Sequence, residues 1–179
     1  MKRNDFFMNS PYMGNFKVTQ KYSDSHDGLD LVGIDSKDIH STVSGIVEYA
    51  GWENSNNHSQ GFGQYVKIID AKTGYGFYFG HLSEIRVNVG QIVNVTDIIG
   101  IEGSTGYSTG SHCHYCIRKN GKGTDINVSE FSGIPNIEGK IFNDGYPGTK
   151  SDSNSDYRTE YEIIVKMGGK VYKGKIKED

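Results

Sequence analysis

Two histidines lie one residue apart, directly after the glycine- and hydroxyl-rich stretch Gly103–Ser111. If the residues that follow this stretch are extended, successive side chains alternate between the two faces of a strand, so His112 and His114 point to the same side. Two imidazoles held side by side suit a metal ligand and a neighbouring proton-transfer group. Because His-x-His pairs also occur by chance, this interpretation depends on partners elsewhere in the chain.

A second polar group lies earlier in the sequence, in the segment Ser25–Val32. Its alternating pattern is typical of a strand. His26, Gly28 and Asp30 would then share one face, and the glycine would leave room between the two polar side chains. Ligands that converge on one ion need such a gap.

The elements that would position these residues are strands. At 179 residues the chain fits one domain with a small appendage. Glycine (24) and tyrosine (12) are abundant, proline (3) is scarce, and no helical period is sustained over ten residues, which is typical of an all-β chain. The most regular pair of segments forms a predicted hairpin that ends at His81. The predicted strands are Phe16–Gln20, Gly28–Val32, Thr42–Trp52 with a bulge or bend at Gly45, Gln64–Ile69, Tyr75–Gly80, Gln91–Val95, Ile98–Glu102 and His112–Ile117.

Charge and hydropathy exclude several kinds of partner. Lys plus Arg is 19 and Asp plus Glu is 22, and a formal net charge of −3 argues against a nucleic-acid-binding protein. No run of about 18 apolar residues exists, so we expect no transmembrane helix and no membrane partner. The first residues, Met1–Phe7, have basic side chains but no apolar core, and so do not form a secretory signal. Cys113 and Cys116 are too close together to cross-link a fold, so we expect reduced thiols.

The composition changes in the last quarter of the chain. Residues 136–160 contain a run rich in Gly, Ser, Asn and Asp, and are predicted to form a linker after a main domain, 1–135. Residues 161–179 contain two extended segments around Gly168-Gly169, which indicates a β-hairpin. Because a lone hairpin is marginally stable in water, we expect it to dock on the main domain, pair with another copy or begin a further module.

Taken together, His26-x-x-x-Asp30, the sequence Gly-His-Leu-Ser at 80–83 and the glycine-rich loop that ends in His112-x-His114 resemble the lysostaphin/LytM-type zinc peptidases of bacterial cell walls. Each motif alone is weak, but the set is specific, and the resemblance covers roughly residues 16–127. It implies a mainly antiparallel β domain, with a groove floored by the sheet and walled by loops. The glycine-rich loop would be one wall of that groove and not a phosphate cradle, since it lacks the Gly-Lys-Ser/Thr signature and a following helix.

The resemblance also implies roles, position by position. His26, Asp30 and His114 would be the ligands of one zinc ion per chain, and His81 and His112 would be the catalytic histidines beside it. Three N/O ligands leave a fourth zinc position for water, as catalytic sites require. Zinc lowers the pKa of that water towards about 7 and polarises the scissile carbonyl. One histidine would then act as general base, while the other stabilises the oxyanion or protonates the leaving amine.

One departure from the family pattern lies on the strand of the paired histidines. Relatives commonly have Glu or Gln two residues after the second histidine, whereas this chain has Cys116, on the same face as His112 and His114. A thiol there could ligate the metal or be prone to oxidation, but a buried, inert thiol is the commoner arrangement. Cys113 lies on the opposite face and is expected in the core.

The remaining histidines and two tyrosines have simpler interpretations. His40 and His58 are expected to be surface or core residues, although His58 lies in the predicted loop Glu53–Gly63, where its alternative role is a substrate contact. Tyr22 and Tyr78 could stabilise an oxyanion or orient a substrate, but packing is the more common role of tyrosine in a β protein.

The sequence therefore predicts a zinc metalloendopeptidase that hydrolyses peptide bonds in peptidoglycan cross-links or cross-bridges and lyses the bacterial wall. Two alternatives are a catalytically silent relative that binds wall peptides or regulates another hydrolase, and a structural component of a phage tail or virion. Without a secretory signal, the chain is expected to be a phage-encoded lysin, a virion-associated protein or a domain of a longer secreted protein. Its partners would be stem or cross-bridge peptides, and the hairpin 161–179 would bind the wall or self-associate.

Overall fold

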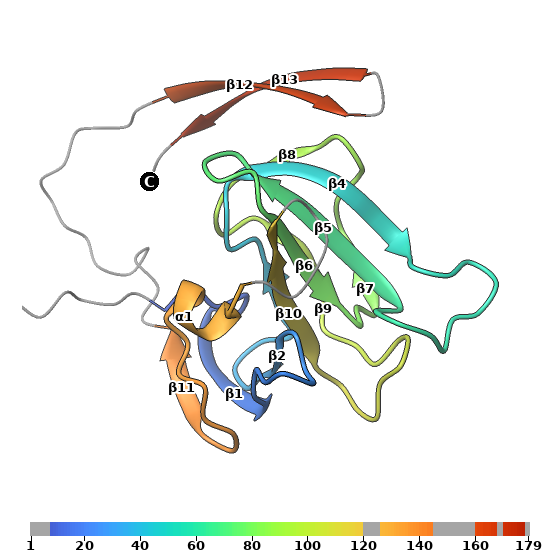
Figure 1. Ribbon diagram of the computed structural model, residues 1–179, viewed down its shortest axis with the longest axis vertical. Coiled ribbons are helices and arrows are strands. Elements are labelled where there is room, and N and C mark those ends of the chain that lie inside the picture. Colours follow the sequence, from blue (N-terminus) through green and yellow to red (C-terminus); the bar gives the residue numbers. More distant parts are fainter. Residues whose placement is uncertain (1–7, 120–125, 145–159, 168–169, 178–179) are drawn as a thin grey trace, which may run out of the picture.

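The computed structural model describes residues 8–119 and 126–144, together with the backbone of two strands at 160–167 and 170–177. Its body is one antiparallel sheet of eight strands (Figure 1). These strands are β1 (Gly14–Gln20), β2 (Leu29–Gly33), β4 (Gly45–Trp52), β5 (Gln64–Asp70), β6 (Gly76–Gly80), β8 (Ile92–Val93), β10 (Cys113–Arg118) and β11 (Ile141–Asp144). Their order across the sheet is β11-β1-β2-β10-β6-β5-β4-β8. The predicted mainly antiparallel β fold is confirmed.

A smaller antiparallel sheet has the order β3-β9-β7 and consists of β3 (Asp38–His40), β7 (Glu84–Ile85) and β9 (Ile98–Ile101). Ile39 of β3 and Ile99 of β9 are fully buried and belong to the same hydrophobic cluster as the core of the large sheet. A single turn of helix, α1 (Val128–Ser132), begins at the capping side chain of Asn127. Among the described residues, no helix has the length and apolar character to cross a membrane.

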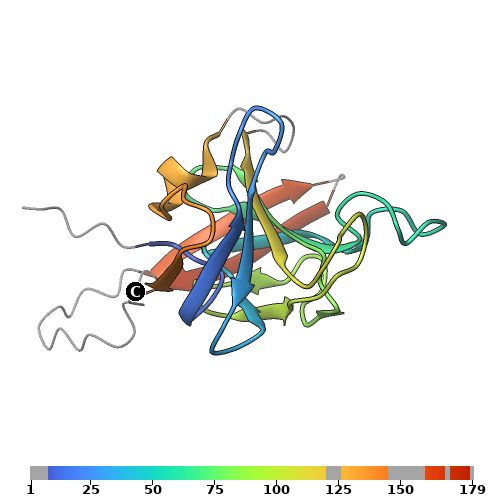
Figure 2. The same ribbon diagram turned by 90° about the horizontal axis from the view of Figure 1, so that it is seen from below.

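The large sheet extends further along the sequence than expected. The linker was predicted over 136–160, but β11 lies inside that span and pairs with β1, and the rings of Phe142 and Phe16 pack 6.1 Å apart between centroids. The strand was missed because its two apolar residues, Ile141 and Phe142, are adjacent and followed by Asn and Asp, so the segment shows no alternation. Farther along, β12 (Glu160–Met167) and β13 (Lys170–Lys177) form an antiparallel two-stranded sheet of their own (Figure 2). Residues 145–159 lie outside the described part, and the role of the hairpin stays a prediction.

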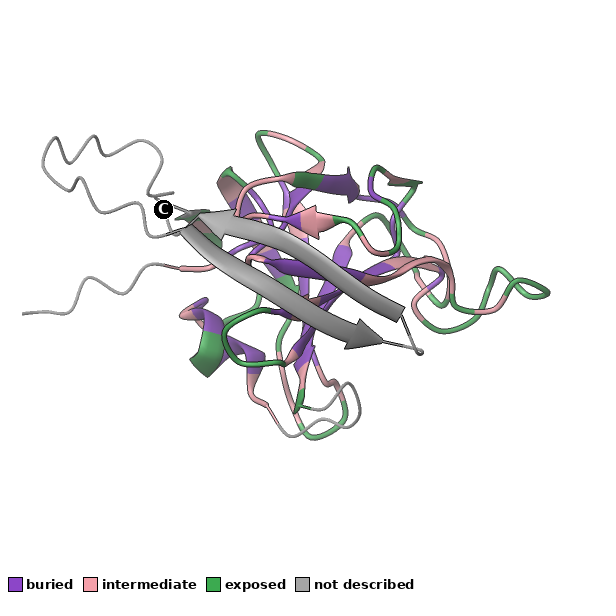
Figure 3. Ribbon diagram, turned by 90° about the horizontal axis from the view of Figure 1, so that it is seen from above, coloured by how far each residue is buried: buried purple, intermediate pink, exposed green. Residues whose placement is uncertain are grey.

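Alternation along the central strands decides which face of the large sheet is the core. On β10, Tyr115 and Ile117 are fully buried, and on β6 the same holds for Phe77 and Phe79. Each such side chain contributes roughly 1.5–3 kcal/mol through burial. Buried stretches lie mainly on the strands, and exposed ones mainly on the loops (Figure 3). On these two strands the odd-numbered residues therefore face the core. His114, in the middle of β10, has the opposite parity and faces the other side.

The strand irregularity predicted at Gly45, a bulge or bend, lies elsewhere in β4. The register between β4 and β5 shifts between Val47 and Tyr49, whereas Gly45 pairs regularly with Asp70. Glycine is needed at position 45 for a different reason, since a Cβ there would overlap the backbone oxygen of Ile69 on the neighbouring strand. The sequence shows that a small residue is required but not whether the cause is a bulge or a close approach of two strands.

Candidate metal centre and active site

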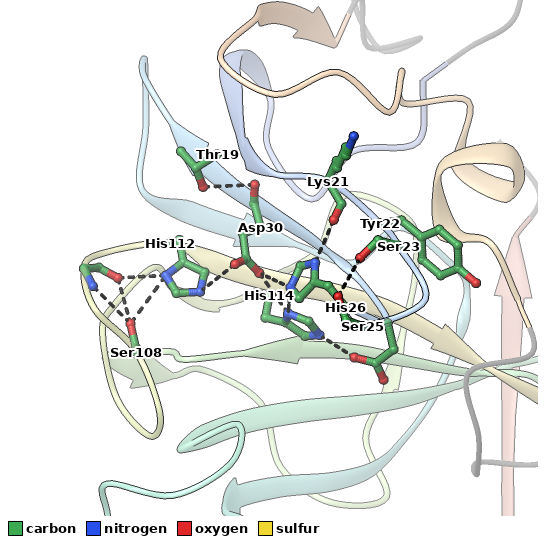
Figure 4. Close-up of polar contacts among 12 residues, drawn as sticks. Thr19, Lys21, Tyr22, Ser23, Ser25, His26, Asp30, Ser108, His112 and His114 are labelled. Atoms are coloured by element: carbon green, nitrogen blue, oxygen red, sulfur yellow. Dashed lines mark hydrogen bonds and ion pairs between the residues drawn. The ribbon is translucent and has the colours of Figure 1, made fainter.

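Three side chains converge where β2 and β10 lie side by side (Figure 4). The strand register pairs His114 directly with Asp30, and His26 lies on the segment just before β2. The Asp30 Oδ1 atom is 2.8 Å from His114 Nδ1 and 3.2 Å from His26 Nε2, and these two nitrogens are 3.2 Å apart. The structure thus brings together the three residues predicted as metal ligands.

The hydrogen bond of His26 to the backbone orients its imidazole ring. Its Nδ1 atom lies 2.9 Å from the backbone oxygen of Lys21, which can only accept a hydrogen bond, so the Nδ1–H donates and the lone pair is on Nε2. That lone pair faces Asp30 and His114. Two imidazole nitrogens and one carboxylate oxygen, all within 4.8 Å of one another, form a donor set that suits zinc and leaves a coordination position open.

The second ring nitrogen of His114 lies next to a residue that the sequence analysis missed. His114 Nε2 is 3.2 Å from Asp27 Oδ1, and the Arg118 guanidinium donates to Asp27 Oδ2 at 2.6 Å. The His114 contact and Arg118 hold the pKa of Asp27 well below its usual range. Strand parity would have placed Asp27 on the face opposite His26. It faces the site because β2 begins only at Leu29, so that parity does not apply to the preceding loop.

The carboxylates of Asp27 and Asp30 stabilise positive charge on and around the His114 ring. Burial alone would lower the pKa of His114, but the contacts with Asp27 and Asp30 outweigh burial and raise it well above its ordinary value. Burial would raise the pKa of Asp30, and the contacts with His114 and His26 lower it instead. A cation at the centre of this group, whether a proton or a metal ion, is therefore stabilised by its surroundings.

Gly28 makes room for the converging side chains, but in a different way from that predicted. A Cβ at this position would lie 2.7 Å from both His114 Cε1 and His114 Nε2, and 2.8 Å from the backbone oxygen of Tyr115. The space is therefore occupied by the imidazole ring of His114. It does not serve to separate His26 from Asp30, which lie 3.2 Å apart at their nearest polar atoms.

His81 immediately follows β6 and has a left-handed backbone, with φ of 62°. Such a conformation is uncommon outside glycine and marks a site where the fold imposes a backbone position. Its Nδ1–H donates to the backbone oxygen of Thr105 at 2.7 Å, which leaves the lone pair on Nε2. Burial, followed by the proximity of His112, lowers the pKa of His81 to about 4, so the ring is neutral at pH 7.

His112 lies beside His81, with 4.6 Å between ring centroids. Its Nδ1 atom is 2.7 Å from the backbone oxygen of Gly110, so this ring also donates through Nδ1. Its Nε2 atom points towards the metal-ligand group and lies 3.6 Å from Asp30 Oδ2. The two residues predicted as catalytic therefore lie beside the three predicted ligands. In both of them Nδ1 bonds to a backbone oxygen and Nε2 is left for other contacts.

A cleft of about 520 Å³ opens over this centre and is lined by all five predicted residues. One wall contains Tyr107, Ser108 and Thr109, as predicted for the glycine-rich loop. Phe62 also lines the cleft. Its neighbour Gly61 lies beside the glycine-rich loop, since Tyr107 N donates to the oxygen of Gly61 at 2.9 Å.

The two cysteines are buried and unpaired with each other. Cys116 is not part of the group formed by His26, Asp30 and His114. Its sulfur lies on the far side of the His114 ring, within 4.8 Å of ligand atoms of His114 and Asp27. This placement agrees with the buried thiol that the sequence favoured.

Other candidate residues have structural contacts. The His40 ring bonds to the backbone oxygen of Thr96 at 2.7 Å, and the His58 ring stacks on Trp52 with 3.6 Å between centroids. Tyr78 is 5% exposed and packs among aromatic rings. Neither Tyr78 nor Tyr22 lines the cleft.

Comparison with known proteins gives a consistent family assignment. Residues 24–126 match the model of Peptidase family M23. Lysostaphin of Staphylococcus simulans is 34% identical over 90 residues, which are 50% of this chain and 17% of that protein. The glycyl-glycine endopeptidase ALE-1 of Staphylococcus capitis is 28% identical over 143 residues, which are 79% of this chain and 37% of that protein. The chain thus spans less than two fifths of the length of these relatives.

Solved structures show the same fold. The catalytic domain of lysostaphin from Staphylococcus simulans superposes with a TM-score of 0.54 at 27% identity, covering 68% of this chain and 92% of that domain. A mutant of the catalytic domain of the prophage-encoded M23 protein EnpA from Enterococcus faecalis gives a TM-score of 0.51 at 29% identity, covering 67% and 91%. Because the family match spans more than half of the chain and contains the whole converging site, the chain belongs to Peptidase family M23.

Proposed function

We propose that the chain is a zinc-dependent endopeptidase that hydrolyses peptide bonds in peptidoglycan cross-links or cross-bridges and so lyses bacterial walls. The observation that carries this proposal is the convergence of His26, Asp30 and His114 at the floor of a cleft, with His81 and His112 beside them. Membership of a metallopeptidase family supports it. The names of relatives point to the same substrate class, since they include a glycyl-glycine endopeptidase and a DD-carboxypeptidase/endopeptidase.

We assign His26 Nε2, Asp30 Oδ1 and His114 Nδ1 as the atoms that hold one zinc ion. Zinc in this position supplies a Lewis acid that polarises the scissile carbonyl and lowers the pKa of water towards about 7. The donor set fits this role because both imidazoles present a lone pair while their other nitrogens contact Lys21 O and Asp27.

The catalytic histidines perform the proton transfers. The Nδ1–H groups of His81 and His112 are bound to backbone oxygens, so Nε2 is the nitrogen through which each ring can accept a proton. One ring takes a proton from the attacking water as the new carbon–oxygen bond forms. A proton is then delivered to the amine nitrogen as the carbon–nitrogen bond breaks. Because the rings are neighbours, the two transfers can be divided between them.

The experiment that tests the proposal combines metal analysis with single substitutions. We expect one zinc ion per chain in protein purified without chelator, and release of new amino termini from isolated walls. His81→Ala and His112→Ala should each lower the rate at least a hundredfold while zinc content and the circular dichroism spectrum stay unchanged.

Two outcomes would reject parts of the proposal. Full activity in either variant would remove that histidine from the mechanism, and zinc binding without any bond cleavage would favour a silent wall-binding relative. Mass spectrometry of fragments released from walls of several cross-link types identifies the bond that is cut.

A further inference from the structure

Glu102 is a buried carboxylate that the proposed mechanism does not use. It follows β9 directly, and its side chain has no exposed surface. Four donors surround it. Oε1 accepts from Lys37 Nζ at 2.8 Å and from Ser111 Oγ at 2.5 Å, while Oε2 accepts from Tyr12 Oη at 2.6 Å and from Gly33 N at 2.8 Å.

These donors belong to two parts of the active site. Gly33 ends β2, the strand that contains Asp30, and the Tyr12 hydroxyl also contacts the backbone oxygen of Leu31 on the same strand. Ser111, in contrast, immediately precedes His112. A single carboxylate therefore connects the strand of a proposed metal ligand to the loop that ends at a proposed catalytic histidine.

The loop has few other anchors near His112. The Ser108 hydroxyl bonds to Ser104 and to the oxygen of Gly110, and it lies 3.4 Å from His112 Nδ1, which itself bonds to that same oxygen. Among the side chains of residues 108–111, Ser111 is the one whose hydrogen bond reaches outside residues 103–112. The backbone bond from His112 N to Gly103 O fixes the base of the loop but not the approach of the chain from Gly110.

We propose that Glu102 is a positioning residue for His112, acting through the hydroxyl of Ser111. By holding Ser111 against β2, it sets the distance between His112 Nε2 and the metal ligand Asp30, which is 3.6 Å. This inference rests on the proposed function, because it assigns Glu102 to the same reaction. Proton transfer and attack depend steeply on geometry, and a misplacement of about 1 Å can lower a rate by about a hundredfold.

A purely structural role, as the buried partner of Lys37, is the alternative. Substituting the two side chains that donate to Oε1, Ser111 and Lys37, one at a time distinguishes the two roles. Ser111→Ala removes the link to His112 but leaves the ion pair, whereas Lys37→Met removes the ion pair and leaves the link. Ser111 is exposed and Lys37 is 49% exposed in its side chain, so both variants should fold.

The test uses the full zinc-loaded chain and a soluble cross-link peptide. For Ser111→Ala we expect kcat to fall about tenfold, with KM and zinc content unchanged and the thermal midpoint nearly unchanged. Ser111→Thr, which keeps the hydroxyl, should restore kcat. Lys37→Met should lower the thermal midpoint while kcat stays within about twofold. The proposal is overturned if the kcat of Ser111→Ala equals that of the wild type. It is also overturned if kcat simply follows the thermal midpoint in all three variants.

A second measurement is independent of turnover. Nitrogen NMR of the histidine rings should show one ordered Nδ1–H form of His112 in the wild type and in Ser111→Thr, and a shifted or broadened signal in Ser111→Ala. If the wild type cleaves no peptide but these spectra differ as expected, the proposed function fails and the positioning role stands. If the three spectra are the same, the positioning role is wrong whatever the activity.

Discussion

At the scale of single residues, the notable feature is that His114 uses both of its ring nitrogens. Nδ1 faces the ligand group with Asp30, and Nε2 faces Asp27, which is held in turn by Arg118. A carboxylate on the outer nitrogen of a metal-binding imidazole fixes the orientation of the ring and increases its basicity. Two residues after His114 on the same strand the chain has Cys116, and Asp27 provides the carboxylate from a different segment.

Asp27→Asn tests this outer contact. The substitution keeps the size of the side chain but removes its charge, so we expect zinc affinity to fall by about 10- to 100-fold. Competition against a chromophoric chelator measures the dissociation constant. Asp24→Asn, at an exposed position three residues earlier, is the matched control and should leave the affinity unchanged. Equal affinities for the two variants would show that Asp27 does not support the metal site.

The sequence was sufficient to predict which residues meet, but not all the contacts that hold them. His26, Asp30, His81, His112 and His114 were predicted as a set, and the structure brings all five to one cleft. Asp27 was missed because strand parity was applied to a residue that lies before the strand. Glu102 was missed because a lone carboxylate at the end of an apolar segment has no pattern, and its donors are 9 to 90 residues away along the chain.

At the scale of elements, the same two strands form both the core and the site. Leu29 and Leu31 of β2 are fully buried on one face, while Asp30 between them points to the other. On β10, Tyr115 is buried, and His114 faces Asp30 and His26. Because the core fixes the register of β2 against β10, it also fixes the distance between two of the proposed metal ligands.

Gly28→Ala tests how closely this arrangement is packed. The added Cβ would lie 2.7 Å from the His114 ring and 2.8 Å from a backbone oxygen, and overpacking of this kind typically costs about 1–3 kcal/mol. We therefore expect a lower free energy of unfolding in urea and weaker zinc binding, because the ring must move. Gly110→Ala is the control, since a Cβ there meets nothing within 4 Å. If Gly28→Ala matched this control in both measurements, the close packing described here would be incorrect.

Several strands were predicted closely, but two of the shortest were missed. The hairpin of β5 and β6 and the strand β10 lie within one residue of their predicted bounds. β3 and β7 were not predicted, because two or three residues are too few to show alternation. They form with β9 a sheet whose pairing depends on residues far apart in the chain, which no local pattern records.

At the scale of the whole molecule, the proposed ligands connect parts of the chain that are distant in sequence. His26 and Asp30 come from its beginning, and His114 lies more than 80 residues later. A metal ion bound to all three is expected to bind the folded chain much more tightly than the unfolded chain, where these residues are far apart. Metal binding is therefore coupled to global stability.

Removal of zinc should consequently destabilise the entire described domain. At a free zinc concentration of about 1,000 times the dissociation constant, binding contributes about 4 kcal/mol. For a domain of this size, 1 kcal/mol corresponds to about 2–4 °C in the thermal midpoint, so chelation should lower the midpoint by about 8–16 °C. Differential scanning calorimetry of the chain with and without chelator measures the shift. In Asp30→Ala the midpoint should not respond to chelator, since one of the three ligands is missing. A wild-type midpoint that is insensitive to chelator would mean that the three residues hold no metal in the folded chain.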